Sequence, residues 1–126
     1  MLSRVRMISL AAAAAAVLAL AAVSLASGAS HPMLTGVVGK NNAYKISLTF
    51  NGKVVKTLKA GTYTVVIHDD SAMHNFELDG PNGKSWTFTG VGFVGTKTFT
   101  LKFTAGKYKA YCKPHEAFMF QHFSVS

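Results

Sequence analysis

The stretch FTLKFTAGKYKAYC, residues 99 to 112, decides the fold class. Apolar residues recur at every second position on both sides of a turn signal, Ala105-Gly106. A period of two with one apolar face is the pattern of strands that cover a core on one side. The apolar positions are Phe99, Leu101 and Phe103 before the turn, and Tyr108, Ala110 and Cys112 after it. The segment therefore predicts two strands joined by a short turn, with Cys112 facing inward at the end of the second.

The chain upstream of this stretch repeats the pattern, with Ile46, Leu48 and Phe50 alternating with polar residues. Further turn signals separate the apolar runs, at Asn51-Gly52, Ala60-Gly61, Gly80-Pro81-Asn82-Gly83, and Gly90 with Gly92. Short strands with turns at this spacing indicate an all-β antiparallel sandwich or barrel. Beyond the first 29 residues we find no useful helical periodicity, internal repeat or linker. We therefore expect one domain, residues 30–126.

The first 29 residues have the layout of a secretory signal peptide. Arg4 and Arg6 precede an apolar run from Ile8 to about Val23, and a tail of small residues follows. The tail suits cleavage after Ala29, although Ala26 is a competing site. An uncleaved membrane anchor is the alternative, but the run is shorter than the ~20 apolar residues that a spanning helix needs. We expect an extracytoplasmic protein (periplasmic, in the cell envelope or secreted) with no stable membrane span after cleavage.

The charge of the segment from residue 30 onward excludes one class of partner and favours another. It holds 11 of the 13 basic residues, since only Arg4 and Arg6 lie in the leader, and all five acidic ones, so its formal charge is +6 (11 − 5). All 11 are lysines, spread along the chain, whereas a nucleic-acid groove clusters its charges and uses arginine. We expect no nucleic-acid partner. A basic surface of this kind attracts acidic proteins.

The sequence contains four potential metal ligands, three expected to point into the interior and one expected to lie in a tight loop. Cys112, the only cysteine, shares its strand face with Tyr108 and Ala110, so it cannot form an internal disulfide and points inward. In HNFEL (residues 74–78), His74 lies on the face of Phe76 and Leu78, at the start of a strand. Met119 shares its face with Phe123 and Val125, and His115 lies in the loop between Cys112 and Met119. The inward positions of His74 and Met119 follow from the same alternation of apolar and polar residues.

A thiolate, two imidazoles and a thioether are a ligand set that suits copper, because trigonal His₂Cys sites with a weak axial Met are blue-copper sites. Zinc is the rival, but structural zinc sites take four strong donors and a thioether is a poor one. Taken singly, Cys112 could be a buried small residue or form an intermolecular disulfide, Met119 could fill the core, and His74 could be a hydrogen-bonded core histidine. The combination favours one mononuclear type 1 copper ion.

The segments HNFEL and YCKPHEAFMFQHFSVS resemble the two ligand segments of the cupredoxins, the plastocyanin and azurin family of blue copper proteins. The resemblance is to the small secreted bacterial type, whose C-x-x-H-x-x-x-M pattern fits Cys112, His115 and Met119, and it implies a Greek-key β-sandwich or barrel. It implies that His74, Cys112, His115 and Met119 hold the metal. It also implies that the side chain of Asn75 ties the two ligand loops together. The seven-residue step from Cys112 to Met119 differs from that of plastocyanin.

The expected function is one-electron transfer by Cu(I)/Cu(II) cycling between redox partner proteins, and we expect a monomer rather than an enzyme. Copper storage or delivery outside the cytoplasm is the alternative, and a metal-free binding sandwich is a third possibility. The resemblance implies that His115 is the port for electrons, within a docking patch that includes Pro114 and Phe118, unless Phe118 is buried core. His31, His68 and His122 are weaker candidates: His68 is expected to be a hydrogen-bonded surface residue and His122 to face solvent.

Overall fold

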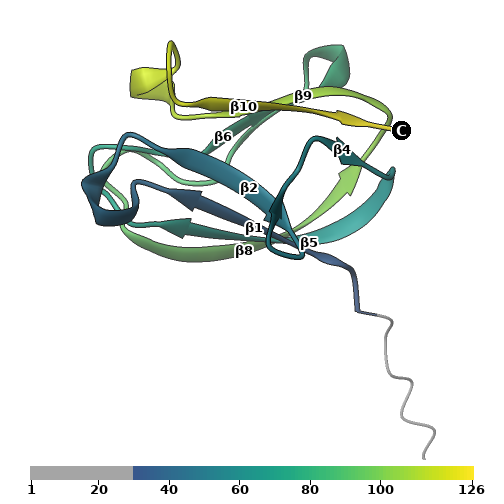
Figure 1. Ribbon diagram of the computed structural model, residues 1–126, viewed down its shortest axis with the longest axis horizontal. Helices are drawn as coiled ribbons and strands as arrows, with labels where there is room; N and C mark the ends of the chain where they lie inside the picture. Colours follow the sequence, from purple (N-terminus) through teal and green to yellow (C-terminus); the bar gives the residue numbers. More distant parts are fainter. Residues whose placement is uncertain (1–29) are drawn as a thin grey trace, which may run out of the picture.

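The computed structural model describes residues 30–126, which form two five-stranded sheets (Figure 1). The first sheet has the order β3-β2-β1-β5-β8 and the second the order β4-β10-β9-β6-β7. The strands of the first sheet are β1 (Met33–Val38), β2 (Ile46–Phe50), β3 (Lys53–Val54), β5 (Gly61–Asp69) and β8 (Gly95–Phe103). Those of the second are β4 (Thr57–Leu58), β6 (Glu77–Asp79), β7 (Ser85–Thr87), β9 (Gly106–Tyr111) and β10 (Phe120–Val125).

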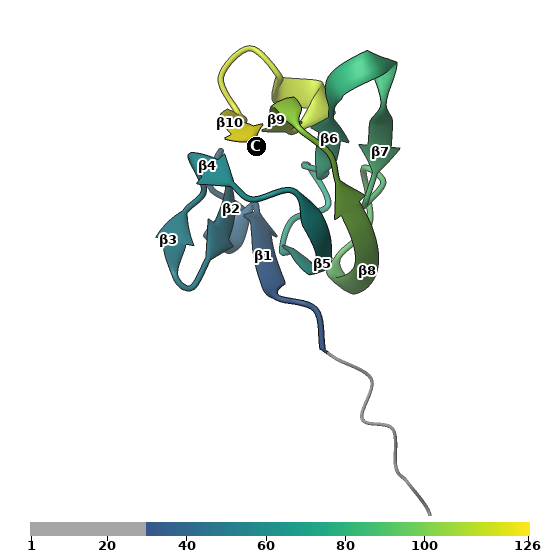
Figure 2. The same cartoon turned by 90° about the vertical axis from the view of Figure 1, so that its right-hand side faces the viewer.

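The two sheets lie face to face, with the layer of β10, β9 and β6 above the layer of β2, β1 and β5 in Figure 2. The expectation of an all-β sandwich is confirmed. Within the described residues the only helical segments are three short 3-10 turns, η1 (Lys40–Asn42), η2 (Pro81–Gly83) and η3 (Lys113–His115). In that part of the chain no helix has the length and apolar character to cross a membrane. The expected leader, residues 1–29, lies outside the described residues.

Most strand pairs are antiparallel, as the sequence indicated, but two pairs are not. β1 pairs with β5 in parallel, and β10 pairs with β4 in parallel, whereas the other strand pairs are antiparallel. Alternation in a sequence reports which face of a strand is buried, but it carries no information on the direction of the neighbouring strand. The parallel pair β1–β5 has a functional consequence, because it brings the ends of both strands, Val38 and Asp69, to the same edge of the first sheet.

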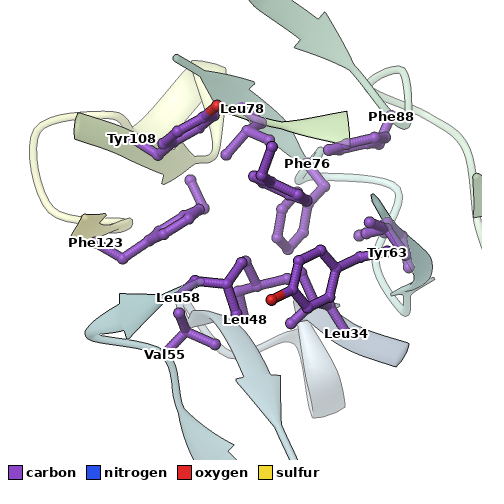
Figure 3. Close-up of a cluster of buried hydrophobic side chains, with 14 of the residues drawn as sticks. Leu34, Leu48, Val55, Leu58, Tyr63, Phe76, Leu78, Phe88, Tyr108 and Phe123 are labelled. Carbon is purple, nitrogen blue, oxygen red and sulfur yellow. The ribbon is translucent and has the colours of Figure 1, made fainter. Parts of the chain in front are cut away.

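The core between the sheets is built from the alternating residues that the sequence indicates. In Figure 3, Tyr108, Phe123 and Leu78 of the second sheet face Leu34, Leu48 and Tyr63 of the first. The alternating residues of β9 that point inward, Tyr108 and Ala110, are at most 2% exposed. Burying such side chains is the main favourable term in folding. The core therefore provides rigid support for the residues at the end of the sandwich.

Gln121 joins the two sheets at a second place, outside this apolar core. Its side-chain oxygen accepts from the backbone N–H of Leu48 at 2.8 Å. Its amide nitrogen donates to the carbonyl oxygens of Leu48 at 3.0 Å and Val55 at 2.9 Å. The side chain thereby links β2 to Val55, which follows β3. It fixes the start of β10, which follows Met119, against the first sheet.

Candidate metal centre

Cys112 follows β9 directly and its side chain is fully buried. The backbone geometry that follows it is a tight turn, in which His115 N–H donates to the carbonyl of Cys112 at 3.1 Å. Pro114 is the second residue of this 3-10 turn, η3, where a missing N–H is tolerated and the fixed φ of proline suits the turn. The inward orientation predicted for Cys112 from the alternation in β9 is confirmed by its burial.

His74 lies in the loop between β5 and β6, three residues before β6 begins at Glu77, and not at the start of its strand as the sequence indicated. The loop turns through side-chain hydrogen bonds. The amide of Ser71 donates to Oδ1 of Asp69 at 3.3 Å, and the amide of Met73 donates to the hydroxyl of Ser71 at 3.2 Å. Such turns use Asp and Ser in place of ladder bonds. The His74 ring is nevertheless fully buried, as the alternation in HNFEL indicated.

Gly39 supports His74 from the first sheet. It follows β1, has φ +70°, and lies so close to the loop that an added Cβ would be 2.5 Å from Cβ of Ser71 and 3.0 Å from Cδ2 of His74. A side chain at this position would therefore displace the loop. Only glycine combines this left-handed conformation with so close an approach.

His115 and Cys112 converge with His74 on a single point. Nδ1 of His74 and Nδ1 of His115 are 3.0 Å apart, and each lies 3.7 Å from Sγ of Cys112. A triangle with these sides has a point roughly 2.0 Å from all three corners, and bonds from a first-row ion such as zinc to His and Cys are about 2.0–2.3 Å. Within residues 30–126, these three form the one group of His, Cys and carboxylate side chains with the spacing of a metal site. The donors present therefore fit one ion.

Met119 lies opposite Cys112 at the same end of the sheet. The register Phe120↔Tyr111 of β10 and β9 continues by one pair, because the amide of Cys112 donates to the carbonyl of Met119 at 3.1 Å. Side chains of opposed residues in an antiparallel pair point to the same face, with Cβ atoms about 4.5–5.5 Å apart. Met119 is 1% exposed, so its side chain shares the buried face of Cys112. The amide of Met119 also donates to the carbonyl of His115 at 2.8 Å.

The electrostatics of the site favour a neutral imidazole at His74. Burial lowers the pKa of His74 below its usual 6.5, and the nearby His115 lowers it further, while Asp69 and the backbone of Asn42 act in the opposite direction. A histidine must be neutral at the nitrogen that binds a metal. Because the pKa of His74 is lowered, the binding of a metal would release few protons from this side chain. Nε2 of His74 is buried without a hydrogen-bond partner in the described residues.

Asn75 connects the two ligand segments. Its side-chain oxygen accepts from the backbone N–H of Lys113, the residue after Cys112, at 2.8 Å. Asn75 itself follows His74, so one hydrogen bond fixes the distance between the two segments. Asn75 and Glu77 face away from His74 and Phe76, as the alternation indicated, but both are buried. Each is hydrogen-bonded where it is buried: Asn75 to the backbone of Lys113, and Glu77 to the hydroxyl of Thr87 on β7.

Tyr44 is a neighbour of the site that the sequence did not indicate. Its ring centroid lies 4.9 Å from those of both His74 and His115, in edge-on contacts, and 5.8 Å from that of Phe118. It is half exposed. An aromatic residue in the polar run NNAYK, residues 41–45, carries no periodic signal, so only the folded chain places it over the two imidazoles.

The remaining candidates lie apart from the metal site. Nδ1 of His68 is 3.0 Å from the hydroxyl of Thr96, which agrees with a hydrogen-bonded residue at the surface. His122 faces solvent as expected, and His31 is exposed before β1. Phe118 is 60% exposed, so the alternative that it belongs to the core is wrong. Pro114 is exposed as well.

Of three comparisons with known proteins, the one with solved structures bears on the fold. No family model and no curated protein matched the chain. Solved structures did match. A methionine-to-glutamine mutant of rusticyanin aligns with a TM-score of 0.54 and 20% identity, over 75% of this chain and 76% of that one. A structure described as the copper protein rusticyanin gives 0.52 and 18% over the same shares.

Rusticyanin from Thiobacillus ferrooxidans gives a TM-score of 0.51 with 21% identity, again over 75% of this chain and 76% of that one. At such low identities, the structural likeness shows a shared fold and nothing more. The covered share is close to that of the described residues, 97 of 126 (126 − 29), so the likeness extends over nearly the whole sandwich. Rusticyanin is a cupredoxin, and the fold of this chain is therefore the cupredoxin fold.

Proposed function

We propose that the protein is an extracytoplasmic type 1 copper protein that carries single electrons, with His74, Cys112, His115 and Met119 as the metal ligands. The observation that carries the proposal is the convergence of two imidazole nitrogens and one thiol sulfur, 3.0 to 3.7 Å apart, at the end of the sandwich. The likeness to rusticyanin, which is described as a copper protein, supports the choice of metal. A set of one thiolate, two imidazoles and a thioether supports it independently.

A copper ion bound by these residues would supply a one-electron Cu(I)/Cu(II) couple. The protein contributes the arrangement of the donors. Three of them are held by buried backbone hydrogen bonds of a single turn, and the fourth is held by a loop packed against Gly39. A site whose donors are fixed before the metal arrives rearranges little when the charge of the ion changes. Four protein donors leave no position for a substrate, so we propose a carrier and not an enzyme.

The exposure of the ligands indicates where a partner docks. His74 and Cys112 are fully buried, whereas His115 is partly exposed. Around His115 the surface holds Phe118, 60% exposed, together with the exposed Pro114. We call Pro114, His115 and Phe118 the docking patch. Exposed apolar patches of this kind mark contact surfaces, and small ones suit transient electron-transfer encounters.

A groove extends the docking patch toward the first sheet. Its lining includes Tyr44, Phe118 and Phe120, with Lys40 and Lys45 at its rim and no carboxylate side chain. Lys113, which precedes Pro114, is exposed as well. Positive charge around an apolar contact surface steers a negatively charged partner and raises the rate of encounter. We therefore propose acidic redox proteins as partners, bound weakly by a monomer.

The signal peptide and the site of action belong to the same proposal. The basic start and apolar run of residues 1–29 support export. A single buried cysteine and the absence of disulfides within residues 30–126 are compatible with an oxidising compartment, because Cys112 is committed to the metal site. Residues 30–126 would then be the mature domain.

The test is a visible spectrum and a redox titration of residues 30–126 after reconstitution with Cu(II). An intense thiolate-to-Cu(II) band and a reversible one-electron couple are expected of a carrier. Weak absorption with copper that a chelator removes quickly would support storage or delivery of copper. Failure to bind one copper per chain would overturn the copper proposal and leave a metal-free binding sandwich.

A further inference from the structure

Glu77 is a buried carboxylate whose two oxygens are both engaged next to the metal site. It begins β6 and is 5% exposed. Oε1 accepts from the side-chain amide Nδ2 of Asn75 at 2.8 Å, and Oε2 accepts from the hydroxyl of Thr87 on β7 at 2.7 Å. Among residues 30–126 the one ion pair joins Lys109 to Glu116, so Glu77 has no cationic partner there. A buried polar group is unfavourable unless it is hydrogen-bonded, and here both oxygens have a partner.

The carboxyl oxygens of Glu77 determine which way the amide of Asn75 faces. A carboxylate only accepts hydrogen bonds, whereas an asparagine amide can present either its oxygen or its nitrogen. Facing Glu77, Asn75 must present Nδ2, and its Oδ1 must then point the other way. There it meets the backbone N–H of Lys113 at 2.8 Å. Glu77 therefore selects the one amide orientation in which Asn75 can accept from the segment that carries Cys112.

The result is a continuous chain of hydrogen bonds from the edge strand β7 to the ligand loop. It runs from the hydroxyl of Thr87 through Glu77 and Asn75 to the N–H of Lys113. Asn75 follows His74 and Lys113 follows Cys112, so the chain ends between two of the three converging donors. Connected buried polar groups stabilise one arrangement, and each hydrogen bond contributes less to stability when a member of the network is missing.

We propose that Glu77 is a positioning residue for the metal site, which acts by orienting the Asn75 amide and thereby holding the His74 and Cys112 segments together. Its effect on the metal rests on the proposed function. Its effect on the Asn75–Lys113 hydrogen bond does not, because that bond joins two residues that are not proposed ligands. The two effects are separately measurable.

The first experiment measures amide hydrogen exchange by NMR in the metal-free protein. Glu77→Ala should speed exchange at Lys113 on the order of tenfold, the equivalent of one buried hydrogen bond. The amide of Val65, in the middle of β5, should change far less and serves as the reference for global unfolding. Glu77→Gln should stay close to the parent protein, because its carbonyl can accept from Asn75 while its amide donates to Thr87.

Double-mutant analysis separates positioning from general stability. Asn75→Ala should speed exchange at Lys113 as much as Glu77→Ala does, and the double variant should add nothing further. Additive effects, or an equal acceleration at Val65, would show that Glu77 is merely part of the fold and would overturn the proposal. If Glu77→Ala does not fold, Thr87→Val removes the hydroxyl alone. An unchanged exchange rate at the Lys113 amide in that variant would contradict the proposed chain of hydrogen bonds from Thr87 to Lys113.

The second experiment uses the copper-loaded protein and follows loss of copper to a chelator. Glu77→Ala should release copper several-fold faster than the parent, and Glu77→Gln should not. Equal release rates for all three would restrict the role of Glu77 to the metal-free chain and contradict the proposal. A parent protein that binds no copper would overturn the proposed function instead, while the exchange result at Lys113 would stand.

Discussion

Cys112 and Met119 face each other across the end of the β9–β10 pair, joined by a hydrogen bond of 3.1 Å from the amide of Cys112 to the carbonyl of Met119. Both side chains are buried on one face, at most 1% exposed. Between them the turn of η3 carries His115. Three of the four proposed ligands are therefore placed by eight consecutive residues, 112 to 119, whose backbone geometry is fixed by the sheet at both ends.

The first prediction concerns the thiolate. Cys112→Ser should abolish the intense visible absorption of the copper-loaded protein, because no other thiolate exists in the chain. The fold should persist, since it rests on the apolar faces of the sheets, with a loss in the free energy of unfolding of about 1–2 kcal/mol for a buried hydroxyl. Visible absorption and urea unfolding check the two parts. A variant that stays intensely coloured would show that Cys112 is not the ligand.

The second prediction concerns the weak axial donor. Met119→Gln should lower the reduction potential, because an amide oxygen favours Cu(II) over Cu(I) compared with a thioether. Met119→Leu should raise the potential, because it removes the donor and leaves an apolar side chain in its place. Both variants should still bind copper. Voltammetry measures the shifts, and loss of all copper binding in either variant would make Met119 a primary ligand of another kind of site.

The sequence predicted the faces of the strands well, because alternation follows directly from strand geometry. Cys112 and Met119 lie on the buried face that the pattern assigned to them. It could not predict that β1 and β5 run parallel, since direction depends on the path of the chain between sheets. It also placed His74 on a strand, where a turn built by Asp69 and Ser71 lies instead.

The surroundings of the site were less predictable than its ligands. Tyr44 reaches His74 and His115 from a loop without any periodic pattern, and only the folded chain brings the three rings together. The hydrogen-bond partners of Asn75 were equally difficult to predict from the sequence. Its role between the two segments followed from the resemblance, whereas the link from Glu77 to Thr87 requires the pairing of β6 with β7.

The third prediction tests the close approach of β1 to His74. Gly39→Ala should destabilise the protein by more than Gly52→Ala does. Both glycines have similar positive φ, +70° and +76°, so both substitutions carry about 1–2 kcal/mol of backbone strain. Only at Gly39 would the added Cβ meet another residue, at 2.5 Å from Cβ of Ser71, whereas nothing lies within 4 Å at Gly52. Overpacking of this kind typically adds about 1–3 kcal/mol.

Urea unfolding of both variants measures the difference in the free energy of unfolding. The copper spectrum provides a second measurement, because displacement of Ser71 should move the His74 segment. Gly39→Ala should therefore alter the visible band and Gly52→Ala should leave it unchanged. Equal losses of stability, with both spectra unchanged, would mean that the loop yields without moving His74.

The fourth prediction concerns the buried carboxyl of Asp69. Burial raises its pKa above the usual 3.8, with the neighbouring Asp70 acting in the same direction, while hydrogen bonds from Thr89 and Ser71 and the nearby His74 act against this. A raised pKa means that the folded chain holds the proton more tightly than the unfolded chain. The ionised carboxylate therefore lowers stability above the raised pKa, and this penalty disappears as the pH falls to 3.8.

Asp69→Asn removes the titration while keeping an oxygen that can accept from Ser71. Relative to this variant, the metal-free parent should be least stable near neutral pH and should gain stability as the pH falls through the raised pKa of Asp69. Urea unfolding of the two metal-free proteins from pH 7 to pH 3.5 gives the comparison. A difference in unfolding free energy that does not vary with pH would contradict a raised pKa at Asp69.

The last prediction concerns the docking patch and its charge. Phe118 is 60% exposed beside His115, and Met33 is 56% exposed at the start of β1. Gly39, which contacts the His74 loop, follows the far end of that strand, so six steps of ~3.3 Å per residue place Met33 roughly 20 Å from Gly39. Phe118→Glu and Met33→Glu are thus a matched pair. Each adds one negative charge in place of an exposed apolar side chain, but only one lies in the docking patch.

Oxidation of the reduced copper protein by hexacyanoferrate(III), an anionic probe, should slow as salt is added, because charges on a basic surface are screened beyond ~10 Å at 0.1 M ionic strength. Phe118→Glu should slow the reaction several-fold more than Met33→Glu at low salt, since repulsion acts at the point where electrons leave. The visible spectra of both variants should match that of the parent. Equal rates for the two variants would place the electron port away from His115, and a rate unaffected by salt would remove the role of the lysines in steering.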